Sequence, residues 1–295
     1  MKDFIELFKS YLTDVKKSSD NTIESYMRDI SQFSSYCAVC GIGDLSKVGS
    51  DTLHKYAEHL TGCGKSVSTV SRITASLRCY YKFLLKEGIA KTNPTEKLTT
   101  QKAEKKLPGI LTANEILLLL SQTDGTDFKS IRDKAMLELL YATGIRVSEL
   151  IDLKVYDINL AIGILQLKKG DKERVIPIYP AAVKSLSNYI LNVRPAIVSS
   201  ADEDRLFTNM TGQHLSRQGF WKIIKHYADT AGIKKDITPH TLRHSFAAHL
   251  LENGAKLSDI KEMLGHSDIS STQVYARLMK TKYASSYAKF HPLAK

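Results

Sequence analysis

The amino-acid sequence predicts a mainly α-helical protein with a small β-sheet or hairpin, built as two domains. Apolar residues recur at helical spacing through most of the chain, and two short β-like runs flank one turn-forming segment. A chain of 295 residues also exceeds what a single small core normally organises. A polar, basic stretch poor in apolar anchors sets the boundary. We therefore expect a helical domain over residues 1–98, a linker over 99–108 and a mixed domain over 109–295.

The first domain is expected to contain four helices that form a compact bundle. Asn21 and Glu24 have the spacing of a capping box, which predicts the start of the second helix. The third should run over residues 51–60 and end at Gly62, and the fourth should end before Gly88. The apolar positions of the first, second and fourth helices are Phe4, Leu7 and Phe8; Ile23, Tyr26, Met27, Ile30 and Phe33; and Val70, Ile73, Leu77, Tyr80, Tyr81 and Leu84.

The second domain is expected to combine helices with one hairpin. Thr112 and Glu115 form a capping box that predicts a helix through Leu120. Later elements are a helix over 130–143 before Gly144, β-like runs over 164–167 and 175–178 around KGDKE, a helix opened by Thr238 and Pro239 that carries His240, Arg243 and His244, a short helix capped by Ser270 and Gln273 that holds Tyr275, and a terminal helix with Leu278, Met279, Tyr283 and Tyr287.

The net charge of +11 and the isoelectric point near 9.3 indicate an anionic partner, either nucleic acid or an anionic membrane. Through Leu107 there are 17 Lys and Arg against 12 Asp and Glu, and the remainder has 25 against 19. Because both halves share the excess, a two-domain clamp fits better than a basic tail. Charge alone is equally compatible with a merely basic protein.

Several classes of protein are disfavoured by what the sequence lacks. No apolar run approaches the length of a membrane span, and the N-terminus resembles no export signal, so we expect a cytoplasmic protein without membrane partners. Cys37 and Cys40 form a CxxC pair, but no second pair follows, and we expect no metal site. There is no nucleotide-binding GxxxxGK[ST] motif or acidic cluster, so we expect no cofactor.

The fourth helix presents a polar face that suits a phosphate backbone or the major groove, with a solvated surface as the alternative. The expected DNA-binding residues on or before this helix are Lys65, Ser68, Ser71, Arg72 and Arg78. Lys172, in the turn of the hairpin, is a further DNA-binding candidate, although the alternative of a solvated basic turn suits Lys168 and Lys172 better than it suits Lys169.

Four segments carry the chemistry: ATGIRVSEL (142–150), KKGDKERVIPI (168–178), HTLRHSFAAHLLENG (240–254) and LGHSDISSTQVYAR (264–277). Together, in this order, they resemble the tyrosine recombinase (lambda integrase) family, and most closely its Xer branch. The resemblance covers the whole chain and implies a C-shaped clamp around DNA. It implies a catalytic set that falls on Arg146, Lys169, His240, Arg243, His266 and Tyr275.

The chemistry of phosphodiester cleavage explains why these residue types are needed. Arg146 and Arg243 offer charged planar forks to the phosphate oxygens, where negative charge builds up. Tyr275 attacks phosphorus, and since tyrosine has an ordinary pKa near ~10 it needs help to lose its proton. The resemblance assigns proton transfer at the nucleophile to His240 and the donation of a proton to the leaving 5′-oxygen to Lys169.

The remaining positions of these motifs have smaller parts. The resemblance gives His266 a hydrogen bond to the phosphate. Glu149 is expected to hold Arg146 or a helix end, and His244 and His249 are expected to be structural. Many Xer relatives have Thr-His after the nucleophile, whereas Ala276 and Arg277 follow here, which alters no catalytic position.

The resemblance implies site-specific recombination through a 3′-phosphotyrosyl intermediate and a Holliday junction, serving chromosome dimer resolution and partition at cell division. The implied partners are a double-stranded recombination site, a homo- or hetero-tetramer with a sister recombinase, and an FtsK-type translocase. Three alternatives remain: a mobile-element integrase, a catalytically silent DNA-binding protein of the same fold, and a type IB topoisomerase-like enzyme.

Overall fold

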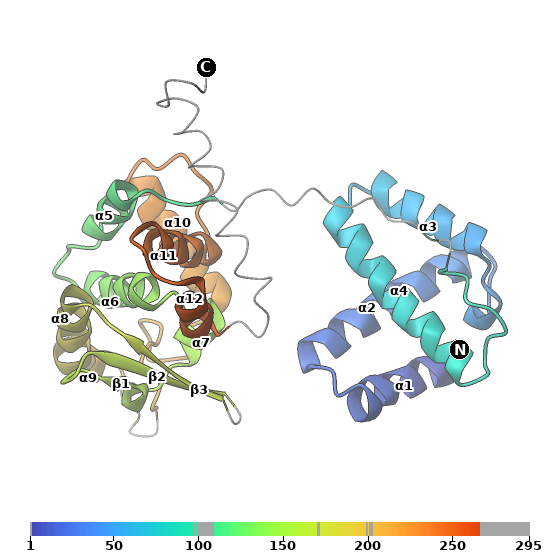
Figure 1. Cartoon of the computed structure of the whole chain (residues 1–295), viewed down its shortest axis with the longest axis horizontal. Helices are drawn as coiled ribbons and strands as arrows, with labels where there is room; N and C mark the ends of the chain where they lie inside the picture. Colours follow the sequence, from blue (N-terminus) through green and yellow to red (C-terminus); the bar gives the residue numbers. More distant parts are fainter. Residues whose placement is uncertain are drawn as a thin grey trace, which may run out of the picture. The chain divides into compact units, whose positions relative to one another are not determined.

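The computed structural model describes residues 2–96, 98, 109–169, 172–198, 200 and 203–265 of the chain. The chain divides into two compact units, Met1–Lys106 and Leu107–Lys295, and the division falls inside the segment expected to be a linker. The regular elements among the described residues of the first unit are helices, and the second unit adds a small antiparallel sheet (Figure 1). The predicted fold class, mainly α with a small sheet, is therefore confirmed.

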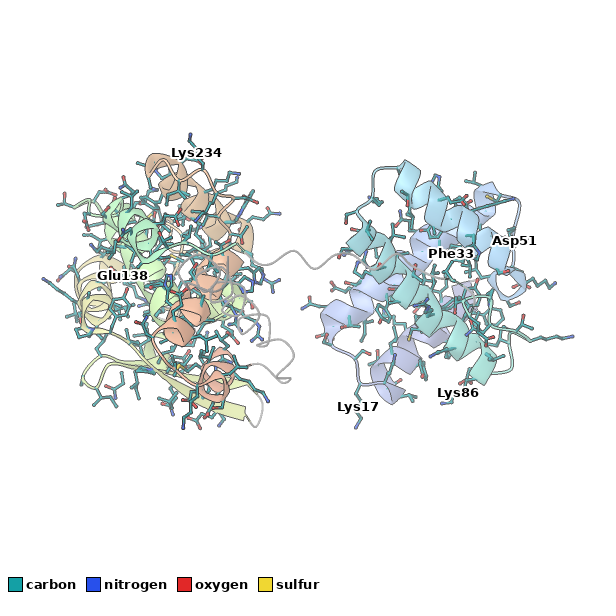
Figure 2. The ribbon with its side chains drawn as sticks, turned by 45° about the horizontal axis from the view of Figure 1, so that its top comes forward. Lys17, Phe33, Asp51, Lys86, Glu138 and Lys234 are labelled. Atoms are coloured by element: carbon teal, nitrogen blue, oxygen red, sulfur yellow. The ribbon has the colours of Figure 1, made fainter. Side chains whose placement is uncertain are left out.

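The N-terminal unit is a bundle of four long helices, as expected. Its elements are α1 (Lys2–Ser10), the π-helical turn η1 (Tyr11–Val15), α2 (Asp20–Val39), the 3₁₀ turn η2 (Leu45–Lys47), α3 (Ser50–Gly62) and α4 (Val67–Lys86). Aromatic side chains fill the space between them: Phe33 lies inside the bundle, whereas Lys17, Asp51 and Lys86 lie at its surface (Figure 2). Phe33 packs on Tyr56 with ring centroids 4.9 Å apart, so the bundle has its own apolar core.

The start of α2 differs from the expected capping box. Ser19 has extended backbone angles, and its hydroxyl accepts the amide N–H of Thr22, so Ser19 is the N-cap and the helix begins at Asp20. The expectation that Asn21 and Glu24 form the capping box was wrong, because Asn21 already lies within the first helical turn. A serine two positions upstream satisfies the same free amide groups.

The C-terminal unit contains the remaining elements. The helices are α5 (Ala113–Ser121), α6 (Phe128–Thr143), α7 (Val147–Asp152), α8 (Pro180–Asn188), α9 (Arg194–Ile197), α10 (Arg217–Thr230), α11 (Pro239–Glu252) and α12 (Leu257–Leu264), with short turns η3 (Val155–Asp157) and η4 (Tyr189–Val193). The Thr112–Glu115 capping box is confirmed at the start of α5. Asp127 caps α6, which therefore begins two residues before the expected Ser130.

The sheet has the strand order β1-β2-β3 and is antiparallel throughout. The expected hairpin is formed by β2 (Ile164–Lys169) and β3 (Lys172–Pro177), and the two-residue strand β1 (Ile158–Asn159) was not anticipated. Leu165 pairs with Ile176, and both side chains are buried in the core. This register brings Lys169 opposite Lys172 at the end of the hairpin.

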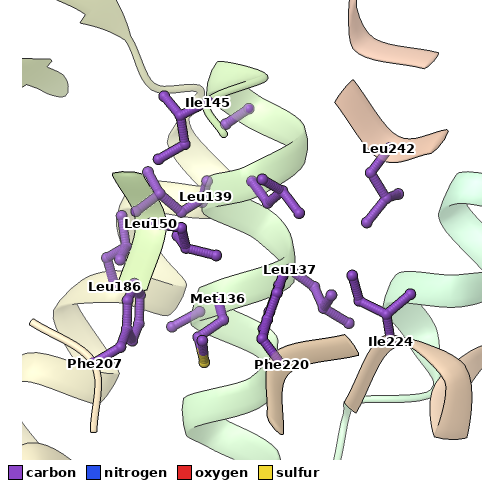
Figure 3. Packing of buried hydrophobic residues seen from close by; sticks show 14 of the residues in the cluster. Met136, Leu137, Leu139, Ile145, Leu150, Leu186, Phe207, Phe220, Ile224 and Leu242 are labelled. Carbon is purple, nitrogen blue, oxygen red and sulfur yellow. The ribbon is translucent and has the colours of Figure 1, made fainter. Parts of the chain in front are cut away.

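Helix α6 runs through the centre of the C-terminal core. Ile224 and Leu242 lie on one side of it, and Leu186 and Phe207 lie on the other (Figure 3). Its hydrophobic residues are consequently buried around the whole helix instead of along one stripe. The end of α6 is thereby held firmly where the candidate site begins.

Gly144 ends α6 in the left-handed conformation, with φ of 58°. A Cβ at this position would overlap the ring of Phe246 on α11. Both the backbone angle and the close approach of α11 therefore require glycine here. Arg146 follows α6 by a few residues, and α11 carries His240 and Arg243. Gly144 therefore sets the distance between the segments that hold these expected catalytic residues.

We expect Gly144→Ala to destabilise the protein by about 2–4 kcal/mol, because it adds steric overlap with Phe246 to the backbone strain. Gly232→Ala is the matched control: Gly232 also has a positive φ, of 65°, but its Cβ would meet no atom within 4 Å. That control should cost only about 1–2 kcal/mol. Urea unfolding measures both values, and equal losses would contradict the packing argument.

Candidate active site

Arg146 is held at the N-terminus of α7 by Glu149. Glu149 Oε2 accepts the backbone N–H of Arg146 at 2.8 Å, and its Oε1 lies 3.3 Å from the Arg146 guanidinium. A carboxylate three residues into a helix is favourably placed against the helix dipole and caps a free amide group. The Arg146 side chain remains 40% exposed, so its guanidinium can still reach a ligand.

Arg243 lies almost fully buried on the second turn of α11, with 4% of its surface exposed. Its guanidinium donates to the carbonyl oxygen of Gly144 at 2.6 Å and to that of Leu264 at 2.8 Å. These carbonyls stand at the ends of α6 and α12, where helices leave acceptors without partners. Arg243 thus joins two segments that are 120 residues apart in sequence, as the numbering shows.

The two expected arginines meet at one place. Arg146 Nη2 lies 3.4 Å from the carbonyl oxygen of Gly265, next to the Leu264 carbonyl that Arg243 binds. Gly265 directly precedes His266 in the sequence. The fold therefore brings together Arg146, Arg243 and the chain segment that leads into His266. His266 and Tyr275 lie outside the described residues, as do the short helix and the terminal helix expected around and after Tyr275.

His240 is exposed on the first turn of α11, and His244 follows one turn later with ring centroids 6.4 Å apart. Partial burial, followed by the electrostatic influence of the neighbouring His240 and Arg243, lowers the pKa of His244 to about 4. His244 is therefore neutral near neutral pH, whereas His240 is open to solvent. His249, five residues further along α11, lies within hydrogen-bond distance of the Tyr141 hydroxyl at 2.9 Å, and this contact fits the structural part expected for it.

Lys169 and Lys172 flank the turn of the hairpin. Lys169 is the last residue of β2, Lys172 is the first of β3, and the two pair in the antiparallel register. Their side chains lie outside what the structure describes. The backbone therefore gives their place in the fold.

Arg174 is the residue of this site that sequence reasoning missed. Its Nη2 lies 2.7 Å from Glu149 Oε2, and the side chain is only 13% exposed. Glu149 is thus paired with two arginines, Arg146 and Arg174, so among these described side chains positive charge exceeds negative charge by one. Arg174 belongs to the KER run of the hairpin, which lies in a segment already singled out in the sequence. Nothing in the local sequence shows whether an arginine on a strand points into a site or into solvent.

Glu149 stays ionised within this cluster. Burial by itself would raise the pKa of its carboxyl group, but the Arg146 amide and the Arg174 and Arg146 guanidiniums together hold that pKa below its ordinary value. An ionised Glu149 can accept from both arginines at once. A surplus of positive charge so arranged suits a phosphodiester, whose transition state gathers negative charge on its oxygens.

The candidate DNA-binding residues of the N-terminal unit divide into two groups. Lys65 and Ser68 are exposed around the start of α4. Arg72 instead forms an ion pair with Asp29, whose side chain is 2% exposed and also accepts the Ser76 hydroxyl at 2.6 Å. Arg78 donates to the carbonyl oxygen of Leu98. The two arginines therefore have partners inside the unit.

Two family models match the chain in the same two regions. The N-terminal SAM-like domain of phage integrases matches residues 5–88, and the phage integrase family itself matches residues 110–282. The second match covers more than half of the chain, including the cluster around Arg146 and Arg243. This chain belongs to the phage integrase family of tyrosine recombinases.

Curated relatives of this recombinase match it over essentially the whole chain. A protein named tyrosine recombinase XerD from Staphylococcus epidermidis is 43% identical over 295 residues, which is all of both chains. A second tyrosine recombinase XerD, from Halalkalibacterium halodurans, is 46% identical over 278 residues, with 94% of this chain and 93% of that protein covered. The resemblance to the Xer branch is confirmed, and the chain is a site-specific recombinase.

Solved structures share the fold. XerH bound to a palindromic difH substrate superposes with a TM-score of 0.76 at 20% identity, covering 97% of this chain and 94% of that one. A lambda integrase fragment bound to a core site gives 0.71 at 18% identity, covering 93% and 94%. XerA recombinase gives 0.55 at 25% identity, covering 99% of both chains. At such low sequence identities the similarity shows a shared fold and says nothing about the details of the site.

The ion pair of Arg72 predicts a stability effect that Lys65 does not share. Arg72→Ala should cost about 2 kcal/mol, because it leaves the buried Asp29 carboxylate without its counter-charge. Lys65→Ala should stay within about 0.5 kcal/mol of the parent. Adding Asp29→Asn to Arg72→Ala should restore part of the loss. Urea unfolding tests all three variants, and an unchanged stability in Arg72→Ala would contradict the pairing.

The half-buried His244 predicts a loss of stability on mild acidification. Its pKa is about 4 in the folded protein and 6.5 in the unfolded chain, so below pH 6.5 the unfolded state binds the extra proton. The free energy of unfolding should therefore fall between pH 6.5 and pH 4, by at most about 3 kcal/mol from this group. Chemical unfolding at a series of pH values measures the slope. His244→Gln should flatten it, and an unchanged slope in that variant would exclude His244 as the source.

Proposed function

We propose that this recombinase cleaves and rejoins DNA at specific sites through Tyr275. The observation that carries the proposal is the convergence of Arg146 and Arg243 on the carbonyl groups of Leu264 and Gly265, directly before His266. Two guanidiniums fixed at one point, with a net positive charge around them, form a site for a single phosphate.

In the proposed reaction the Tyr275 hydroxyl oxygen attacks phosphorus while its proton passes to His240. The 5′-oxygen of the DNA leaves and takes a proton from Lys169, so a 3′-phosphotyrosyl bond replaces the phosphodiester. Arg146 and Arg243 neutralise the charge that develops on the non-bridging oxygens, and His266 adds a hydrogen bond there. Attack by the 5′-hydroxyl of a partner strand reverses these steps and rejoins the DNA.

The DNA is proposed to lie between the two domains, as in a C-shaped clamp, with Lys65, Ser68 and Lys172 contacting its backbone. Arg72 and Arg78 are already bound to Asp29 and to the Leu98 carbonyl. They would contact DNA only by binding a phosphate and these internal partners at the same time. Four protomers, alone or with a sister recombinase, would assemble on two sites and pass through a Holliday junction. The C-terminal segment would dock on a neighbouring protomer.

The biological role that we propose is chromosome dimer resolution, with an FtsK-type translocase as a partner, in the cytoplasm. Its support is that proteins named XerD are 43–46% identical across nearly the full chain. The alternative is a mobile-element integrase with the same chemistry, and the Tn1549 transposon integrase is similar to this chain in fold alone, at 18% identity. Among the described residues, no helix is long and apolar enough to cross a membrane.

The catalytic proposal is tested with a nicked suicide substrate that traps the covalent adduct. The wild-type protein should accumulate a DNA adduct resistant to denaturation, and Tyr275→Phe should form none, because it lacks the attacking oxygen. Tyr283→Phe, in the same C-terminal region, is the matched control and should form the adduct. Loss of the adduct in the control alone, or adducts in Tyr275→Phe, would contradict the assignment of the nucleophile.

Arg243→Lys should bind the same substrate but cleave it at least ~100-fold more slowly. Lysine keeps the charge but loses the fork that holds the Gly144 and Leu264 carbonyls and the phosphate together. Single-turnover cleavage rates and equilibrium DNA binding separate the two effects. Cleavage within a few-fold of the wild type would show that the fork is unnecessary.

A further inference from the structure

Arg174 occupies a position that links three parts of the candidate active site. It lies on β3, opposite Leu167 and two residues from Lys172, and so belongs to the hairpin that carries Lys169. Its guanidinium reaches Glu149 at the start of α7, at 2.7 Å. Strand β3 also packs against α12, which ends at Leu264 and is capped by Gly265 (Figure 1).

The Glu149 carboxylate is shared between two arginines. Its Oε2 accepts from both the Arg146 amide and Arg174 Nη2, while its Oε1 faces the Arg146 guanidinium at 3.3 Å. With Arg174 present, Glu149 is held from the hairpin side and its second oxygen is left for Arg146. Without it, the carboxylate would be free to turn and to take both oxygens to Arg146. The Arg146 side chain would then be pulled away from the scissile phosphate.

Gly265 also lies in close contact with Arg174. Its φ is 62°, and a Cβ there would fall on the Arg174 guanidinium, so the residue before His266 lies directly against this side chain. The Nε of Arg174 is buried and has no acceptor among the described residues. The Arg174 guanidinium therefore lies between the Glu149 carboxylate and the residue before His266.

We propose that Arg174 is a positioning residue for strand cleavage. It fixes Glu149 so that the Arg146 guanidinium stays directed toward the scissile phosphate, and it sets the hairpin against the segment that leads into His266. Arg174 acts through Glu149 and does not itself touch the reacting atoms. The proposal rests on the proposed function, because it concerns the same cleavage reaction.

The first test compares Arg174→Gln and Arg174→Lys with the wild type and with Arg205→Gln. Arg205 also pairs with a carboxylate, Glu203, at 3.1 Å, but lies outside the cluster. Arg174→Gln should slow single-turnover cleavage ~10–100-fold with DNA affinity within about two-fold, as expected for a small misplacement of a catalytic group. Arg174→Lys should recover part of the rate, and Arg205→Gln should cleave like the wild type.

The second test separates positioning from a general loss of structure. A substrate with an uncharged methylphosphonate at the scissile linkage has less charge for Arg146 to neutralise, so the defect of Arg174→Gln should shrink at least ~5-fold on it. A variant that is merely less well folded slows cleavage of both substrates equally. In a Glu149→Gln background, Arg174→Gln should add less than ~3-fold, because the two residues act in series.

Three outcomes would overturn the inference: wild-type cleavage by Arg174→Gln, equal defects on the charged and uncharged linkages, or multiplicative losses in the double variant. If Arg174→Gln does not fold, the same comparison of the two linkages is made with Arg174→Lys. A wild-type protein that forms no adduct contradicts the proposed function itself. That result is distinct from an active wild type whose Arg174 variants cleave normally.

Discussion

The buried guanidinium of Arg243 is the interaction on which the candidate site depends. It donates to the carbonyl oxygens of Gly144 and Leu264, two helix ends that have no partners within their own helices. An arginine almost removed from water is costly unless its donors are matched, so its place in the core fixes the distance between these segments. Gly144, pressed against Phe246, fits the same geometry from the backbone side.

The electrostatics of the site follow from that framework. A positive side chain at the N-terminus of a helix opposes the helix dipole, and Glu149 in the first turn of α7 offsets this for Arg146. The same carboxylate binds Arg174, so one negative charge serves two positive ones and the surplus remains available to a phosphate. Arg243 contributes charge and shape together, because its fork is already spread across two carbonyls.

The N-terminal unit uses arginine differently. Arg72 neutralises the buried Asp29, and Arg78 binds the Leu98 carbonyl near the end of the unit. Basic residues on one helix face can thus stabilise the bundle as well as meet DNA. The exposed Lys65 and Ser68 have no such internal task in the described contacts, which makes them the simpler candidates for a phosphate backbone.

The sequence by itself determined the fold class, the four helices of the first unit, the hairpin and the family. These depend on local signals, namely apolar periodicity, caps such as Thr112 with Glu115, and motifs in a fixed order. Local signals also misled where two caps competed, since Ser19 precedes Asn21 and satisfies the same amide groups first.

Only the tertiary structure decided which charges meet. Arg72 and Asp29 are 43 residues apart, and Arg174 and Glu149 are 25 apart, with nothing in the intervening sequence that specifies either pair. Such contacts depend on how β3 lies against α7 and how α4 packs on α2, which no periodicity encodes. The sequence therefore supplied the residue types of this recombinase, and the packing of distant segments decided which arginines gather at the candidate site and which pair inside the N-terminal unit.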